Sequence, residues 1–147
     1  MTYKSTKTYT HSTGLSCCFR QWKADSHCNQ LHGYALQVQI TFVAETLDSR
    51  GWVVDFGGMG DIKKWLEDNF DHKLLVAEDD PRIESILALS YEGIADVIQV
   101  PRVGCEAFAE YIYDYVDKWV YGSEEGRVRL ESVEVREHGG NSAVFCV

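Results

Sequence analysis

Residues 28–34, with the sequence CNQLHGY, place a thiol, an imidazole and a phenol close together just before a well-patterned strand. A cysteine acts as a base or a nucleophile only as its thiolate, so Cys28 needs a base or a positive charge beside it. The pair Asp71-His72 supplies an imidazole with an adjacent carboxylate that can orient or charge it. These residue types indicate proton-transfer chemistry, although His32 and Asp71 also suit structural roles, as a core histidine and a turn cap.

Two glutamates stand where a carboxylate could receive a heterocyclic ring. Glu106 falls in the first turn of an expected helix, and Glu137 ends an expected strand before a Gly-rich turn. A carboxylate matches the paired N–H donors on the edge of an aminopyrimidinone, the ring shared by pterins and guanine. The alternatives are an interaction of Glu106 with the helix dipole and a solvated charge at Glu137.

The composition is that of a globular protein, and we expect residues 1–147 to form a single domain. Hydrophobic residues make up 45% of the chain and only two prolines occur, which is unlike a disordered segment. The five cysteines are odd in number and none is spaced as CxxC, so we expect no disulfide.

Charge and hydropathy exclude several classes of partner. The net charge of −9 argues against binding to nucleic acid or to anionic membranes. No apolar run reaches the roughly 18 residues of a membrane span. The N-terminal residues are polar and lack the apolar core of a secretory signal, so we expect a cytoplasmic location.

The hydrophobic pattern predicts an α+β domain. Apolar residues alternate with polar ones over 36–44, which predicts a long antiparallel strand, and 52–56 is its expected hairpin partner. Apolar residues recur at helical spacing over 59–70 and 104–121, which predicts two main helices. We therefore expect an antiparallel four-stranded sheet with two main helices packed on one face. Shorter extended or helical segments are expected at 3–19, 79–89, 97–101, 128–135 and 143–147.

The whole chain resembles the 6-pyruvoyltetrahydropterin synthase / 6-carboxytetrahydropterin synthase family. The landmarks occur in the right order with compatible spacing: Cys28-x-x-x-His32-Gly33, WVVDFG at 52–57, Asp71-His72, GCE at 104–106 and VEVRE at 133–137. The resemblance implies the tunnelling fold, assembly into trimers or dimers of trimers, and active sites between subunits. We therefore expect a homo-oligomer, most simply a hexamer, which would also pair exposed sheet edges.

The resemblance also implies a role for each residue named above. Cys28 would be the catalytic thiol, Asp71 and His72 its proton-transfer partners, and Glu137 with Glu106 the anchor of the ring. The implied activity is that of a 6-carboxytetrahydropterin synthase-like lyase acting on 7,8-dihydroneopterin triphosphate or a related pterin. That reaction belongs to 7-deazaguanine and queuosine biosynthesis, and no organic cofactor is expected.

The family binds zinc through three histidines, and this chain departs from that pattern. His32 is retained, but the other two ligand positions hold Phe19 and Tyr34. A phenyl ring cannot bind a metal, a neutral phenol is a poor zinc ligand, and zinc takes three or four protein ligands. Either the metal is lost or other groups hold it with His32. His27 is the nearest candidate, ahead of His11, Cys18 and Cys28.

The altered ligand positions leave a second function open. The chain would then be a non-catalytic or altered-reaction module that binds a pterin or purine and has lost the zinc-dependent step. The retained thiol and Asp-His pair favour the enzyme, whereas the altered positions favour the binding module. A pterin-type small molecule is the expected partner in either case, and Arg20 and Lys23 are candidate contacts for its triphosphate.

Overall fold

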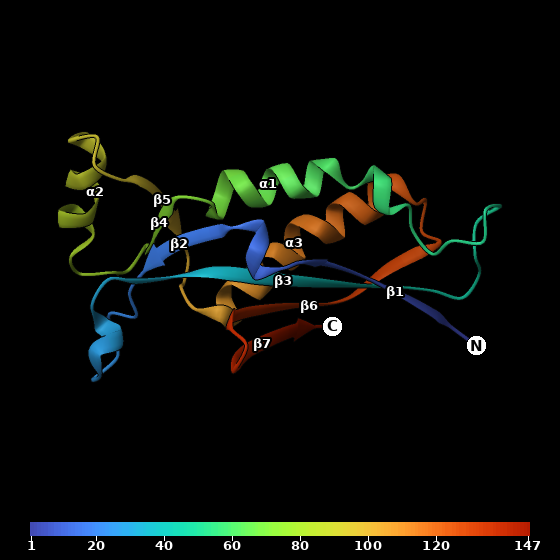
Figure 1. Ribbon diagram of the computed structural model, residues 1–147, viewed down its shortest axis with the longest axis horizontal. Coiled ribbons are helices and arrows are strands. Elements are labelled where there is room, and N and C mark those ends of the chain that lie inside the picture. The colour runs from blue at the N-terminus through green and yellow to red at the C-terminus, as the bar shows by residue number, and fades with distance from the viewer.

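The computed structural model describes all 147 residues, and its seven-stranded sheet is organised around the long strand β3 (His32–Ala44) (Figure 1). The first part of β3 pairs antiparallel with β2 (Leu15–Phe19), and its later part pairs antiparallel with β1 (Tyr3–Tyr9). The other edge of β3 pairs with β6 (Val128–His138), which continues into β7 (Asn141–Cys146). β3 therefore fixes the position of most of the sheet.

Two parallel strands extend the sheet beyond β2. β4 (Lys73–Ala77) pairs with β2, and β5 (Asp96–Val100) pairs with β4. The helices α1 (Gly60–Phe70) and α3 (Cys105–Ser123) lie along one face of the sheet, whereas α2 (Ile83–Tyr91) stands at the β4–β5 end (Figure 1). None of the helices has the length and hydropathy needed to span a membrane.

The apolar alternation of β3 holds α1 and α3 on the sheet. Alternate residues of β3 have no exposed surface and pack in one core with equally buried residues of both helices: Leu36, Val38, Ile40, Phe42, Ile62, Leu66, Phe108 and Ile112. Burying one side chain of this size stabilises the fold by about 1.5–3 kcal/mol. This face of the sheet, called the α1/α3 face below, also carries Cys17 and Phe19 of β2.

The opposite face carries a smaller core beneath α2. Leu74 and Val76 of β4 pack there against Ile86 of α2, with Cys18 of β2 beside them. Leu75, the strand neighbour of both β4 residues, belongs to the main core instead. Because adjacent strand residues point to opposite faces, this end of the sheet is covered on both sides.

The predicted α+β class is confirmed, and three details of the predicted sheet are corrected. The sheet has seven strands rather than four, and β4 and β5 pair in parallel. α2 packs on the second face. The hairpin predicted between 36–44 and 52–56 is wrong: residues 52–55 are irregular and lead into a 3-10 turn, Phe56–Gly58. β1 and β6 occupy the two edges of β3, so no edge remains for 52–56.

Candidate functional site

Three aromatic rings meet on the α1/α3 face where β2 ends and β3 begins. Phe19 pairs with His32 across the two strands, and Tyr34 lies two residues further along β3. The ring centroids lie 5.2 Å apart for Phe19 and His32, 6.1 Å for Phe19 and Tyr34, and 5.5 Å for His32 and Tyr34. The ring of Phe19 is buried against the edge of Phe108 in α3. These three residues form what we call the aromatic cluster.

Glu137 and Cys105 lie beside the aromatic cluster. Val133 and Val135 of β6 are fully buried on the α1/α3 face. Because every second residue of a strand points to the same face, Glu137 lies on this face too, near the end of β6. Burial, and then the charges of the nearby Glu137 and Glu106 carboxylates, raise the pKa of the Cys105 thiol to about 12. Cys105 is therefore a neutral thiol at the first turn of α3.

Tyr34 links the aromatic cluster to the acidic groups around it. Burial is the main cause that raises the pKa of its phenol, followed by the charge of Glu137 and by weaker electrostatic interactions with Cys28 and Cys105. The phenol therefore stays protonated and can donate a hydrogen bond to a bound molecule. The ring of His138 lies 6.2 Å from that of Tyr34. Sequence reasoning missed His138 and Cys105; only their places beside the two predicted glutamates signalled them.

Cys28 lies in a short 3-10 turn, His27–Asn29, within the loop that joins β2 to β3. Its backbone N–H donates to the side chain of Ser26 over 3.4 Å, and its carbonyl accepts from the backbone N–H of Gln21 over 2.9 Å. The residue is half-buried, so a small molecule can reach the thiol. Cys28 and Glu137 both act electrostatically on the phenol of Tyr34, so the three residues lie near one another at this end of the sheet.

Arg20 and Asp80 form a buried ion pair behind the Cys28 turn. Nε and Nη2 of Arg20 donate to the two oxygens of Asp80 over 2.8 and 2.7 Å, and Nη1 donates to the carbonyl of Asn29 over 3.0 Å. The Asp80 side chain is 1% exposed. This geometry argues against the expectation that Arg20 binds a triphosphate. Lys23 lies 3.7 Å from Asp79 and is well exposed.

The ion pair predicts how stability changes in acid. Hydrogen bonds from Arg20, and then from the backbone of Arg82, lower the pKa of Asp80 in the folded protein. Such a carboxyl stabilises the fold above its unfolded pKa of about 3.9, and the stabilisation is lost as pH falls through the lower folded value. We expect Asp80→Asn to lower the free energy of unfolding at neutral pH, and the deficit to shrink as the pH falls below about 4. Urea unfolding across this range measures it; a deficit independent of pH would contradict the assignment.

His72 lines a cavity that Tyr34 also lines, and Asp71 lies beside His72. Nδ1 of His72 and Oδ1 of Asp71 lie 2.6 Å apart, and the backbone N–H of His72 donates to Ser16. His72 has φ 59°, a left-handed conformation that is uncommon outside glycine, and its side chain is 86% exposed. The cavity has a volume of about 570 Å³, and its other lining residues include Cys18 and Leu74, from the α2 face. No hydrogen bond joins the pair to Cys28.

Glu106 faces away from the aromatic cluster. Its exposed side chain lines a cavity of about 290 Å³ together with Trp22 and Lys23. The structure thus gathers Cys28 and Glu137 around Tyr34. His72 shares a cavity with Tyr34 but makes no hydrogen bond to Cys28, and Glu106 lines another cavity.

The donors near His32 do not fit a zinc ion. Its Nδ1 lies 2.8 Å from the carbonyl oxygen of Gln30, and its ring neighbours are Phe19 and Tyr34. Neither His32 nor His27 belongs to a group of three or more His, Cys, Asp or Glu side chains that could hold a metal. Zinc needs three or four such donors in tetrahedral geometry.

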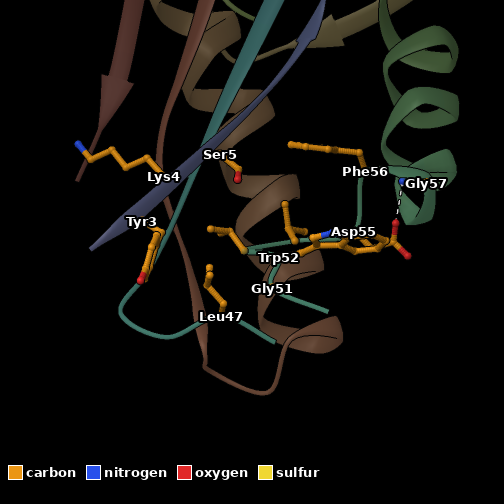
Figure 2. A pocket seen from close by; sticks show the side chains of 11 residues that line it. Tyr3, Lys4, Ser5, Leu47, Gly51, Trp52, Asp55, Phe56 and Gly57 are labelled. Carbon is orange, nitrogen blue, oxygen red and sulfur yellow. Dashed lines mark hydrogen bonds between the residues drawn. The ribbon is translucent and has the colours of Figure 1, made fainter. Parts of the chain in front are cut away.

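A further cavity of about 390 Å³ lies at the other end of β3, between β1 and the 47–57 loop. Figure 2 shows residues of β1, such as Tyr3 and Lys4, on one side and Leu47, Trp52 and other loop residues on the other. None of the predicted catalytic, binding or metal residues lines this cavity.

Gly33 lets β2 and β3 approach closely beneath the aromatic cluster. A Cβ atom at this position would collide with the carbonyl oxygen of Cys17 on the neighbouring strand. We expect Gly33→Ala to destabilise the fold by about 2 kcal/mol, as overpacking does. Gly60→Ala is the matched control, because a Cβ there has nothing within 4 Å. Urea unfolding of both variants tests this, and equal midpoints would contradict it.

The chain matches the family model described as 6-pyruvoyl tetrahydropterin synthase over residues 8–146. A 6-carboxy-5,6,7,8-tetrahydropterin synthase of Rickettsia felis is 43% identical over 54 residues, which is 36% of this chain and 39% of that protein. The matched segment thus spans about two fifths of that relative. The enzyme of the same name from Aquifex aeolicus is 25% identical over 107 residues, 71% of this chain and 66% of that protein.

Solved structures share the fold over nearly the full length. An uncharacterized protein of Wolinella succinogenes superposes with a TM-score of 0.85 at 18% identity, covering 99% of this chain and 98% of that one. A catalytic-residue mutant of Plasmodium vivax 6-pyruvoyltetrahydropterin synthase gives a TM-score of 0.70 at 15% identity, covering 99% and 97%. At these identities the likeness establishes the fold alone, and it is the fold that the sequence resemblance predicted.

Proposed function

The chain belongs to the 6-pyruvoyl tetrahydropterin synthase family, and from this premise we propose that it is a pterin lyase of the 6-carboxytetrahydropterin synthase type. The observation that carries the proposal is the convergence of Cys28, Tyr34 and Glu137 at one end of the sheet. The proposed substrate is 7,8-dihydroneopterin triphosphate or a related pterin, and the proposed pathway is 7-deazaguanine and queuosine biosynthesis.

Each of the three residues has a separate task in the proposed reaction. The Glu137 carboxylate accepts the paired N–H donors on the aminopyrimidinone edge of the ring. The protonated phenol of Tyr34 donates a hydrogen bond to the bound substrate. Held beside them, Cys28 takes a proton from the substrate side chain as its thiolate. Glu106 is a second proposed contact for the ring.

Asp71 and His72 are proposed as the acid/base partner, supplied by a second copy of the chain. Within one protomer His72 lines a cavity together with Tyr34, but neither Asp71 nor His72 makes a hydrogen bond to Cys28. The outer edges of β1, β5 and β7 pair with no other strand, which leaves them free for association between copies. We therefore propose a homo-oligomer, a trimer or a dimer of trimers. A monomer by light scattering would contradict this.

Zinc enters no step of the proposed reaction. In the resembled family three histidines hold the ion, and two of those positions here carry Phe19 and Tyr34. Because the residues present do not fit the ion, neither His32 nor His27 is assigned a metal-binding task.

The aromatic cluster favours one alternative function. At the three positions that hold the zinc-binding histidines in the resembled family, this chain packs three rings against one another. Such a group of rings suits a surface that binds a flat heterocycle. The alternative is therefore a pterin- or purine-binding module that lacks the lyase step.

An assay of the purified protein with 7,8-dihydroneopterin triphosphate tests the proposal. We expect consumption of the substrate and a product with the mass of 6-carboxytetrahydropterin. Binding of the pterin without consumption at an enzyme concentration equal to that of the substrate would support the binding module instead. If the protein neither binds nor consumes the pterin, the lyase and the pterin-binding module are both wrong.

A further inference from the structure

The turn that carries Cys28 has few contacts with the rest of the protein. Within the turn, Asn29 and Cys28 donate to Ser26, and Gln30 donates to His27. Two hydrogen bonds tie the turn to the end of β2: Gln21 N–H to the carbonyl of Cys28, and Arg20 Nη1 to the carbonyl of Asn29. The position of the thiol therefore depends on the residues just after Phe19.

Arg20 is itself held by a buried carboxylate. Asp80 accepts two hydrogen bonds from Arg20 in a bidentate pair and a third from the backbone N–H of Arg82 over 2.8 Å. The side chains of Asp80 and Arg20 are 1% and 20% exposed. A bidentate guanidinium–carboxylate pair fixes the direction of both groups, so Nη1 of Arg20 points to the carbonyl of Asn29 in one orientation. A continuous chain of contacts thus runs from the start of α2 to the Cys28 turn.

We propose that Arg20 and Asp80 are positioning residues that hold the Cys28 thiol beside Tyr34 and Glu137. They act through the carbonyl of Asn29 and touch no substrate. The proposal rests on the proposed function only in taking Cys28 as the reacting thiol. A purely structural ion pair would need no bond to the Cys28 turn, yet Arg20 places one there.

The test compares the alkylation rates of two thiols in the same chain. Cys146 in β7 is exposed and serves as the internal standard for the half-buried Cys28. The double variant Arg20→Met/Asp80→Asn removes the bond to Asn29 without leaving one charge buried alone. With iodoacetamide, we expect the Cys28:Cys146 rate ratio to rise about tenfold, the factor that corresponds to one hydrogen bond from a charged donor. The single variant Asp80→Asn should give a smaller rise in the same direction.

The matched control is a second arginine that holds a loop far from Cys28. Arg127 pairs with Glu124 over 2.7 Å and donates to the carbonyls of Thr46 and Val53. Arg127→Met/Glu124→Gln should lower the melting temperature but leave the Cys28:Cys146 ratio unchanged. Peptide mass spectrometry reads both ratios without any substrate. The positioning effect is therefore tested even if the protein does not consume a pterin.

Turnover supplies the second readout. If the wild-type protein consumes the pterin, we expect Arg20→Met/Asp80→Asn to lower kcat about tenfold. KM should be nearly unchanged, because the ring contacts remain. The proposal would be overturned if the Cys28:Cys146 ratio kept its wild-type value in Arg20→Met/Asp80→Asn and in Asp80→Asn while their melting temperatures fell as in the control. Equal decreases of kcat in the two double variants would show that the Arg20–Asp80 pair is merely structural, and this result would overturn the proposal as well.

Discussion

Cys28→Ser is expected to lower kcat for the pterin substrate about 1,000-fold, within the range found for a positioned acid–base group. A hydroxyl is a far weaker acid than a thiol, so the serine cannot hold the anionic form that takes the proton. The affinity for the ring should stay unchanged, because Glu137 and Tyr34 make those contacts. Single-turnover rates and a pterin titration on the same preparation separate the two effects.

Cys146→Ser is the matched control for that experiment. Cys146 is exposed on β7, and the substitution is chemically the same, so kcat should not change. If Cys28→Ser keeps the wild-type kcat, another group takes the proton and the assignment of Cys28 is wrong.

Glu137→Gln is expected to weaken pterin binding about 100-fold, as when a charge-assisted, two-point hydrogen bond is lost. An amide offers one acceptor oxygen where the carboxylate offers two, and its NH₂ group faces an N–H donor of the ring. Fluorescence titration with dihydroneopterin, which lacks the triphosphate, isolates the ring contact from any phosphate contact.

The control for Glu137 lies on the same strand. Glu131 of β6 pairs with Lys4 over 2.7 Å at the surface, so Glu131→Gln makes the same chemical change outside the site. We expect its dissociation constant to match that of the wild type. Equal losses of affinity in the two variants would show that net charge, rather than a ring contact, sets the affinity.

Local pattern was enough to predict the elements with strong periodicity. Alternation over 36–44 marked the core of β3, and helical spacing marked α1 and α3 to within a few residues. The strand predicted at 52–56 was wrong because its apolar run suits a strand, but β1 and β6, which are distant in sequence, already pair with the two edges of β3. β4 was missed because a short strand covered on both faces has no alternation to detect.

The candidate site divides in the same way. Residue type and spacing singled out Cys28, Glu137 and the Asp71-His72 pair. Sequence separation carries no information on contact, so the position of His72 at a cavity that Tyr34 lines and Cys28 does not became visible only in the structure. The link from Asp80 to Arg20 joins residues 60 positions apart, and no local pattern marks it.

Turnover of 7,8-dihydroneopterin triphosphate by chelator-treated protein, with and without added zinc, tests the proposed function most directly. The aromatic cluster occupies two positions that hold zinc ligands in the resembled family, and Cys28 lies near Glu137, the proposed anchor of the ring. We therefore expect the wild type to consume the pterin at the same rate in both samples and Cys28→Ser to leave it intact. A wild type that binds the pterin and consumes none of it, or that reacts only after one equivalent of zinc has bound, would contradict this.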